Sequence, residues 1–381
     1  MSAHDVAIYA PAAACLYERQ PEVTGGAERQ TTLLARGLVR SGLRVAHIVL
    51  PVSDPVGLDD RLRLVERQLV ATGAGPGARV SQMRRIWSAL AEADAAAYVF
   101  RSGIAALGIA ATFCRLRRRS LVFSSSNNLD FTFDFFAGRR AELALYKHGA
   151  RSSDAIVVQS RDQRDLAQTV FPRGPQVVEI PSFAELAPAS TAPPEAFLWV
   201  GRLDLFKQPL RYVELAAAVP EARFWMVVRR LDPQRSGGSP GGGEDRELER
   251  EVDDRAARLD NLEILEQRPH PAAMELVDRS VAIVNTGVAE GMPNLFLEAW
   301  ARGVPVLSYG FDPDGRVARN GLGVGADGSS ERFAAGARQL WAARNDRDRM
   351  RGRLRDYVER THGIEAVSRR WVRLIAELNG A

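Results

Sequence analysis

Short apolar stretches alternate with longer amphipathic stretches along most of the chain. Apolar runs bounded by turn residues predict strands, and apolar positions recurring about every 3.6 residues predict helices. Predicted strands cover 6–9, 45–50, 97–100, 121–123, 155–158, 197–200, 224–228, 262–265, 281–284 and 304–308. Predicted helices cover 27–40, 104–116, 141–150, 163–170, 210–218, 246–259, 272–279, 295–302 and 364–378. This alternation is typical of parallel sheets with helices on both faces.

The alternation is interrupted once, by a stretch rich in proline, alanine and serine at 187–194, and then restarts. Such a composition predicts an interdomain linker. We therefore expect two Rossmann-like domains, 1–183 and 195–363, with the tail 364–381 packing back on the first. Doubly wound sheets bind ligands at the carboxyl ends of their strands, so the site is expected in the cleft between the domains.

The composition agrees with two ordinary domain cores. The chain has 381 residues, of which 46% are hydrophobic. Its 51 Lys and Arg exceed its 47 Asp and Glu by 4. This small excess suits a phosphate-bearing small ligand or a weak peripheral contact with an anionic membrane, and it argues against nucleic acid as a partner. Cys15 and Cys114 are the only cysteines, which excludes a disulfide framework and a cysteine metal cluster.

The first residues resemble a short signal core at 6–15, but Asp5 precedes it and no Lys or Arg does. A first strand explains this stretch better. The longest run without a charged or strongly polar residue, 103–114, is too short to span a bilayer. We expect a cytoplasmic protein, at most peripheral on the inner membrane face.

Two glutamates, Glu290 and Glu298, flank a predicted helix start that follows the strand 281–284. Pro293 suits the first helical turn, and Gly303 suits the end of the helix. Free amides at the helix start, from Met292 to Leu295, form an anion site. Since carboxylates do not hold an anion, we expect them to bind hydroxyl groups on either side of a phosphate, as a nucleotide sugar would offer.

Two further segments carry candidate residues. Arg202 and Lys207 follow the strand 197–200, and both cations suit a diphosphate. Gly25 and Gly26 begin the helix 27–40, where the backbone can approach a phosphate closely. An ordinary helix start explains the glycine segment equally well.

Together these motifs resemble family 4 of the retaining glycosyltransferases, which have the GT-B fold. The similarity rests on Gly25-Gly26-Ala27-Glu28, on Gly201-Arg202-Leu203 with Lys207, and on Glu290-Gly291-Met292-Pro293-Asn294 with Glu298. It covers nearly the whole chain and is most specific in the second half. The resemblance implies sugar transfer from a nucleotide diphosphate sugar, UDP- or GDP-linked, to a hydroxyl of a saccharide or other acceptor, with retention and without a cofactor or metal.

The resemblance also implies residue roles. Arg202 and Lys207 would hold the diphosphate, Glu298 the ribose hydroxyls, and Glu290 with Gly291–Leu295 the donor sugar. The first domain would bind the acceptor and the second the donor. Many family members have a histidine after the strand at 121–123, where this chain has Ser124-Ser125-Ser126-Asn127-Asn128. Asn127 is therefore our candidate for orienting the acceptor, with a structural turn cap as the alternative.

Three other patterns have plainer explanations. Asp312-Pro313-Asp314 resembles a metal-binding motif of another glycosyltransferase fold, but we expect a turn. The glycine-rich stretch 321–325 is expected to be a loop. The five histidines show no metal-ligand spacing.

Two other functions stay open: a nucleotide-sugar epimerase of the same fold, and a two-lobed solute-binding protein.

Overall fold

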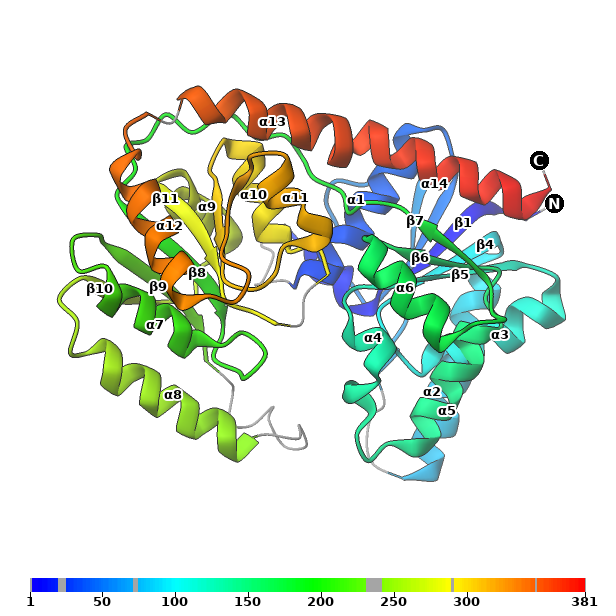
Figure 1. Cartoon of the computed structure of the whole chain (residues 1–381). Helices are drawn as coiled ribbons and strands as arrows, with labels where there is room; N and C mark the ends of the chain where they lie inside the picture. Colours follow the sequence, from blue (N-terminus) through cyan, green and yellow to red (C-terminus); the bar gives the residue numbers. More distant parts are fainter. Residues whose placement is uncertain are drawn as a thin grey trace. The chain divides into compact units, whose positions relative to one another are not determined.

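The computed structural model divides the chain into two units, each built on a parallel sheet with helices on its faces (Figure 1). Unit 1 comprises Met1–Phe183 and Gly363–Ala381, and unit 2 comprises Ala184–His362. The structure describes residues 2–19, 25–70, 75–230, 242–288, 291–346 and 348–380. The predicted fold class is confirmed, since both units are Rossmann-like and the C-terminal helix belongs to unit 1. The roles assigned to the two domains stay predictions.

The described part of unit 1 has a seven-stranded parallel sheet in the order β3-β2-β1-β4-β5-β6-β7. Its strands are β1 (His4–Tyr9), β2 (Val45–Val49), β3 (Leu62–Glu66), β4 (Ala95–Arg101), β5 (Ser120–Ser124), β6 (Ala155–Val158) and β7 (Gln176–Glu179). Its helices are η1 (Pro11–Leu16), α1 (Gly26–Arg40), α2 (Pro76–Ala93), α3 (Ala106–Arg117), α4 (Leu129–Thr132), η2 (Asp134–Phe136), α5 (Arg140–Arg151), α6 (Arg161–Val170) and α14 (Ile364–Asn379).

The central strand β1 shows why the strands of this sheet are apolar throughout. Val6 and Ile8 point into the core shared with α1 and α14, whereas Ala7 and Tyr9 point into the core shared with α2, α3 and α5. All four are buried. Successive side chains of a strand face opposite sides, so a sheet covered by helices on both faces needs an apolar residue at each position.

The tail helix α14 completes one of these two cores. Val367, Trp371, Leu374 and Ile375 are buried against the core that contains β1 and α1. The helices α14 and α1 approach so closely that a Cβ at Gly37 would stand 2.3 Å from Ser368 Oγ. Figure 1 shows α14 lying along α1.

The described part of unit 2 has a six-stranded parallel sheet in the order β10-β9-β8-β11-β12-β13. Its strands are β8 (Ala196–Arg202), β9 (Phe224–Arg229), β10 (Leu262–Glu266), β11 (Ser280–Asn285), β12 (Val306–Ser308) and β13 (Gly323–Gly325). Its helices are α7 (Pro209–Ala218), α8 (Gly242–Ala256), α9 (His270–Asp278), α10 (Asn294–Arg302), η3 (Pro313–Gly315), α11 (Arg316–Arg319), α12 (Ser330–Ala342) and α13 (Asp348–His362).

Two local expectations need correction. The stretch 321–325 is not only a loop, because Gly323–Gly325 pairs with β12 as the strand β13. A Cβ at Gly323 would stand 2.0 Å from the carbonyl oxygen of Val306, so glycine is required for this pairing. Pro293 is not in the first turn of α10: it is the residue before the helix, and its ψ of 124° is extended. Gly303, with a φ of 80°, ends α10 as expected.

Removal of the tail tests the coupling between α14 and unit 1. A chain that stops after Gly363 should lose solubility and melt at lower temperature, because α1 would be left with an uncovered apolar face. The four buried apolar side chains of α14 are each worth roughly 1.5–3 kcal/mol, comparable in sum with the whole stability of an ordinary domain. Thermal unfolding followed by circular dichroism measures the effect. The control chain lacks only Gly380 and Ala381, and equal melting of both chains would contradict the docking.

Candidate functional site

In unit 2 the strand order reverses between β8 and β11, so the chain leaves these neighbouring strands in opposite lateral directions. Such a reversal opens a crevice at the carboxyl ends of the two strands, where doubly wound folds bind ligands. The segment after β8 carries Lys207, and the segment after β11 runs from Asn285 to Gly287. Both line a small cavity of about 50 Å³, together with Pro293 and Leu295 at the start of α10.

Thr286 fixes the two segments to each other. Its hydroxyl donates to the carbonyl oxygen of Lys207 at 2.6 Å and accepts from the indole N–H of Trp199 at 2.9 Å. The backbone N–H of Val288 also donates to the carbonyl oxygen of Phe206, at 3.0 Å. The backbone that carries Lys207 is therefore held against the loop after β11.

Arg202, at the end of β8, is held by a neighbouring carboxylate. Its guanidinium lies 2.8 Å from Asp204, and the Arg202 side chain is 53% exposed whereas that of Asp204 is 10% exposed. The other oxygen of Asp204 accepts from the backbone N–H of Lys207 at 2.9 Å. Asp204 thus holds the guanidinium of Arg202 and the backbone of Lys207, a role that the sequence pattern did not suggest.

The start of α10 lies at the same edge of the sheet. Gly291 and Met292 are buried, whereas Pro293, Asn294 and Leu295 are half-buried. A helix start carries a partial positive charge, which suits the start of α10 to an anionic ligand. Glu290, the other predicted site residue of this loop, lies outside the described residues.

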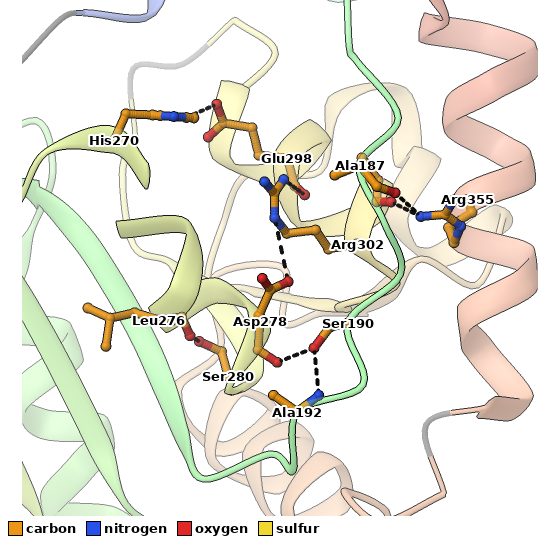
Figure 2. A network of polar contacts seen from close by, with 11 residues as sticks. Ala187, Ser190, Ala192, His270, Leu276, Asp278, Ser280, Glu298, Arg302 and Arg355 are labelled. Atoms are coloured by element: carbon orange, nitrogen blue, oxygen red, sulfur yellow. Dashed lines mark hydrogen bonds and ion pairs between the residues drawn. The ribbon is translucent and has the colours of Figure 1, made fainter. Parts of the chain in front are cut away.

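Glu298 is paired with a histidine that the sequence pattern did not single out. Figure 2 shows the imidazole of His270 beside the carboxylate of Glu298, with 2.8 Å between Nε2 and Oε1. The Glu298 side chain is 16% exposed, and that of His270 is 38% exposed. The predicted helix at 272–279 began two residues late, because α9 starts at His270 itself. Placing the helix start correctly would have put His270 at the first position of the helix after β10, near the carboxyl end of that strand.

The far end of α10 is tied to the segment that enters unit 2. Arg302 donates to the Glu298 carbonyl oxygen at 3.2 Å, and its Nε lies 3.5 Å from Asp278 (Figure 2). Ser190 donates its N–H to the Arg302 carbonyl oxygen at 3.1 Å and its hydroxyl to the Asp278 carbonyl oxygen at 2.6 Å. The helix that carries Glu298 is thereby fixed at its C-terminal end.

Unit 1 repeats the same arrangement, with the reversal of strand order between β1 and β4. A cavity of about 780 Å³ lies at the carboxyl ends of these strands, and Glu28, Arg101 and Gly103 are among its lining residues. Gly25 and Gly26 stand at the start of α1, where Gly25 precedes the helix. A Cβ at Gly25 would stand 2.5 Å from a carboxylate oxygen of Glu28, so the glycine lets this carboxylate fold back on the helix start.

Asp130, 1% exposed, holds the loops after β4 and β5. One carboxylate oxygen accepts from the N–H of Gly103 at 2.8 Å. The other accepts from the N–H of Ser126 at 2.6 Å, the hydroxyl of Ser125 at 3.0 Å, and the N–H of Asn127 at 3.3 Å. Burial raises the pKa of this carboxyl group, and the hydrogen bonds from the two loops oppose the rise.

Asn127 therefore sits in a loop that Asp130 holds. Its side-chain oxygen accepts from the N–H of Leu129 at 2.9 Å. This contact caps the turn, which is the alternative role that the sequence left open for Asn127. Unit 1 also contains the histidines His47 and His148. His47 is fully buried and bonded to the Tyr17 hydroxyl at 2.6 Å, and burial lowers its pKa to about 3. It is neutral and inaccessible at physiological pH, whereas His148 is exposed on α5.

Asp312 and Asp314 form a turn, as expected. Asp312 accepts from the backbone N–H groups of Val317 at 2.7 Å and Ala318 at 3.1 Å, at the start of α11. Asp314 pairs with Arg316 at 2.7 Å. Across the described ranges, no group of three or more His, Cys, Asp or Glu side chains is placed to hold a metal ion.

Substitution of Asp130 tests its role as the brace of unit 1. Asp130→Asn keeps the size of the side chain but replaces one acceptor oxygen by an NH₂ group, which faces donors on one of the two loops. We expect the free energy of unfolding to fall by roughly 1–3 kcal/mol. Urea unfolding measures it, with the exposed Asp134→Asn as the control. A loss no larger than in the control would show that the loops hold their shape without Asp130.

Residues 25–182 match the family model described as glycosyl transferase 4-like domain. Among curated protein sequences, none matches the chain. Sucrose-phosphate synthase from Thermosynechococcus elongatus superposes with a TM-score of 0.74 at 16% identity, over 99% of each chain. HepE from Anabaena, solved in complex with UDP-glucose, superposes with a TM-score of 0.71 at 12% identity, over 98% of this chain and 100% of its own.

WaaG, a glycosyltransferase involved in lipopolysaccharide biosynthesis, superposes with a TM-score of 0.68 at 14% identity, over 97% of this chain and 99% of its own. None of the helices in the described ranges has the length and apolar character needed to cross a membrane. The resemblance inferred from the sequence motifs is confirmed: residues 25–182 match the glycosyl transferase 4-like domain model, and the chain shares the GT-B fold of the glycosyltransferases on which it superposes.

Proposed function

We propose that this protein is a retaining glycosyltransferase that transfers a sugar from a nucleotide diphosphate sugar to a hydroxyl group of an acceptor, without a metal ion. The observation that carries the proposal is the gathering of Lys207, the amides at the start of α10 and the Glu298–His270 pair at the carboxyl edge of the unit 2 sheet. The glycosyl transferase 4-like domain in unit 1 and the fold shared with HepE, which was solved with UDP and UDP-glucose, support it.

In this proposal each group of the edge has one task. Arg202 and Lys207 bind the diphosphate, and the α10 amides donate to phosphate or donor-sugar oxygens. Glu298 accepts from the ribose hydroxyls, with His270 fixing the orientation of its carboxylate. Glu290 would bind the donor sugar. UDP or GDP is the expected carrier, and no resident cofactor is required.

The chemistry follows from fixed positive groups around a leaving diphosphate. The bond between the anomeric carbon and the phosphate oxygen breaks as the acceptor oxygen bonds to the same face of that carbon. The acceptor proton passes to an oxygen of the departing phosphate. Arg202, Lys207 and the helix amides stabilise the charge that develops on the leaving group. In unit 1, Gly25 and Gly26 leave room beside the start of α1, and Asn127 orients the acceptor through the loop that Asp130 holds.

The function is tested by presenting UDP, GDP and ADP to the protein and measuring the shift in melting temperature, followed by incubation with the matching nucleotide sugars. Donor consumption that depends on an added hydroxyl compound, with the anomeric configuration retained by NMR, is the expected result. A donor converted to its epimer without any acceptor would instead indicate an epimerase. Binding of free sugars with no response to nucleotides would indicate a solute-binding protein.

Substitutions at the unit 2 edge should weaken nucleotide binding. Arg202→Ala, Lys207→Ala and Glu298→Ala each remove a charge-assisted hydrogen bond, worth roughly 1.5–3 kcal/mol, so the Kd should rise about ten- to hundredfold. Calorimetry with the free nucleotide measures the Kd. Arg258→Ala is the matched control, because Arg258 is exposed on the segment that precedes β10, at the opposite edge of the sheet. Wild-type affinity in all three variants would overturn the assignment.

Chelation tests the metal requirement. Turnover should persist in excess EDTA, because Arg202, Lys207 and the α10 amides supply positive charge, and Asp312 is engaged with the start of α11. Initial rates with and without EDTA measure this. Activity that is lost in EDTA and restored by magnesium or manganese would contradict it, and would bring Asp312 and Asp314 forward as ligands.

A further inference from the structure

The cavity of unit 1 has the size and position of a substrate site. It lies where the strand order reverses between β1 and β4, and its volume of about 780 Å³ falls in the range of sites for drug-sized ligands. The loops after β1 and β4 form its floor, and α1, α2, α3 and α5 contribute side chains around it.

Most of the wall of this cavity is apolar. The end of the β3 segment and α2 contribute Leu69, Met83 and Ile86, and the loop after β4 with α3 contributes Ile104 and Ile109. Two further apolar side chains come from η2 and α5, Phe136 and Leu145. The apolar surface continues outward on the same side, since Met83 is 45% exposed and Val70, another lining residue, is 54% exposed.

Polar side chains line the cavity in two places. Arg79 and Gln82 of α2 and Arg139 and Glu142 near the start of α5 line its side, where Gln82 donates to the Leu69 carbonyl oxygen at 2.9 Å and Arg139 donates to Glu142 at 3.3 Å.

The other polar groups lie at the strand ends. Arg101 ends β4 and donates to Ser124 Oγ at 3.2 Å, while its buried Nε–H has no hydrogen-bond partner among the described residues. Burial lowers the pKa of Arg101 to about 10, opposed by the charges of Asp130 and Glu28, so it stays a cation at neutral pH. Glu28 and Thr31 of α1 line the same cavity. At the strand ends, Arg101 can therefore donate a hydrogen bond to a ligand hydroxyl oxygen, and Glu28 can accept a hydrogen bond from that hydroxyl.

Backbone contacts fix the side of the cavity that α3, α5 and the loop after β4 form. A Cβ at Gly108 of α3 would stand 2.4 Å from the carbonyl oxygen of Leu145, and one at Gly149 of α5 would stand 2.5 Å from the backbone of Leu107. These glycines let α3 and α5 touch and so set the distance between two walls (Figure 1). Ser102 holds a φ of 73° in the loop after β4, and Asp130 fixes the next residue, Gly103. A preorganised wall cannot rearrange to offer polar partners to a ligand.

We infer that the acceptor is a hydroxyl compound with a mainly apolar body, whose hydroxyl end lies at Arg101 and Glu28 and whose body lies against α2 and α3. This inference rests on the proposed function and specifies its acceptor. A free saccharide would place most of its hydroxyl groups against Leu69, Ile86, Ile104 and Ile109, where they would lose water without gaining a partner. An apolar body would gain from every contact with the same wall. The body can be a ring system or an alkyl chain.

Direct binding to the full-length protein tests the inference without turnover. The ring probe is 4-methylumbelliferone, the chain probe is octyl β-glucoside, and glucose and sucrose are the saccharides without an apolar body. We expect one or both apolar probes to bind, while the two saccharides show no saturable binding at the same concentrations. Saturable binding of glucose or sucrose that exceeds both probes would overturn the inference.

Variants locate the bound probe. Met83→Gln and Ile104→Thr should each raise the Kd of the bound probe about fivefold to tenfold, because each removes apolar contact from the wall. Val80→Gln is the control: Val80 lies on the same helix and is 48% exposed, but does not line the cavity. Circular dichroism confirms that the three variants are folded. An equal Kd in Met83→Gln, Ile104→Thr and the control would place the probe elsewhere and overturn the inference.

Donor assays on the same samples separate this inference from the proposed function. UDP or GDP binding, and nucleotide-sugar consumption with 4-methylumbelliferone or octyl β-glucoside as acceptor, support both. Nucleotide-sugar consumption with sucrose or glucose but with neither apolar compound would overturn the inference and leave the proposed function intact. If no nucleotide binds and no donor is consumed, the proposed function fails, and the acceptor role of the cavity fails with it.

Discussion

The reversal of strand order within each parallel sheet is the constraint on which both candidate sites depend. Between β1 and β4 in unit 1, and between β8 and β11 in unit 2, the following segments turn away in opposite directions. No connection crosses the carboxyl ends of these strand pairs, so side chains with chemical functions can gather there. Arg101 and Gly103 stand at one reversal, and Lys207 and Thr286 at the other. The cores on both faces of each sheet hold this edge in place.

Buried polar contacts then determine the shape of each edge. The two oxygens of Asp130 join the loops after β4 and β5, and the hydroxyl of Thr286 joins the loops after β8 and β11. Loss of these hydrogen bonds would cost more free energy for a buried carboxylate or hydroxyl than for an exposed one. Loop conformations that break the contacts are therefore unfavourable. Asp204 acts similarly on Arg202 and Lys207, and His270 on Glu298. The residues proposed to touch substrate are thus oriented by neighbouring side chains.

Much of the fold could be predicted from the sequence, because both sheets bury apolar strands on two faces and leave a clear pattern. The strand at 155–158 matches β6, and the helix at 364–378 nearly matches α14. The hydrophobic pattern did not predict strands that are only partly buried or whose pairing depends on backbone geometry. In β3 only Leu62 and Val65 are buried, and β13 depends on the absence of a side chain at Gly323. For the site, motif spacing predicted which residues stand at the unit 2 edge. It could not predict Asp130 or His270, because their roles depend on contacts between segments that are distant in sequence.

The helix α14 belongs to unit 1, but in the sequence all of unit 2 comes before it and after the other elements of unit 1. The order in which the ribosome synthesises these segments therefore affects how unit 1 completes its packing. Residues 184–362 form a continuous unit and can fold as soon as they are made. The sheet of unit 1 is made earlier, yet the face covered by Trp371 and Ile375 stays incomplete until the tail has been synthesised. Domains usually fold in the order of their synthesis, with the N-terminal domain first. Here unit 1 can complete its packing only after unit 2 has been synthesised. During that interval the apolar face of α1 around Gly37 lacks the cover that α14 later gives it.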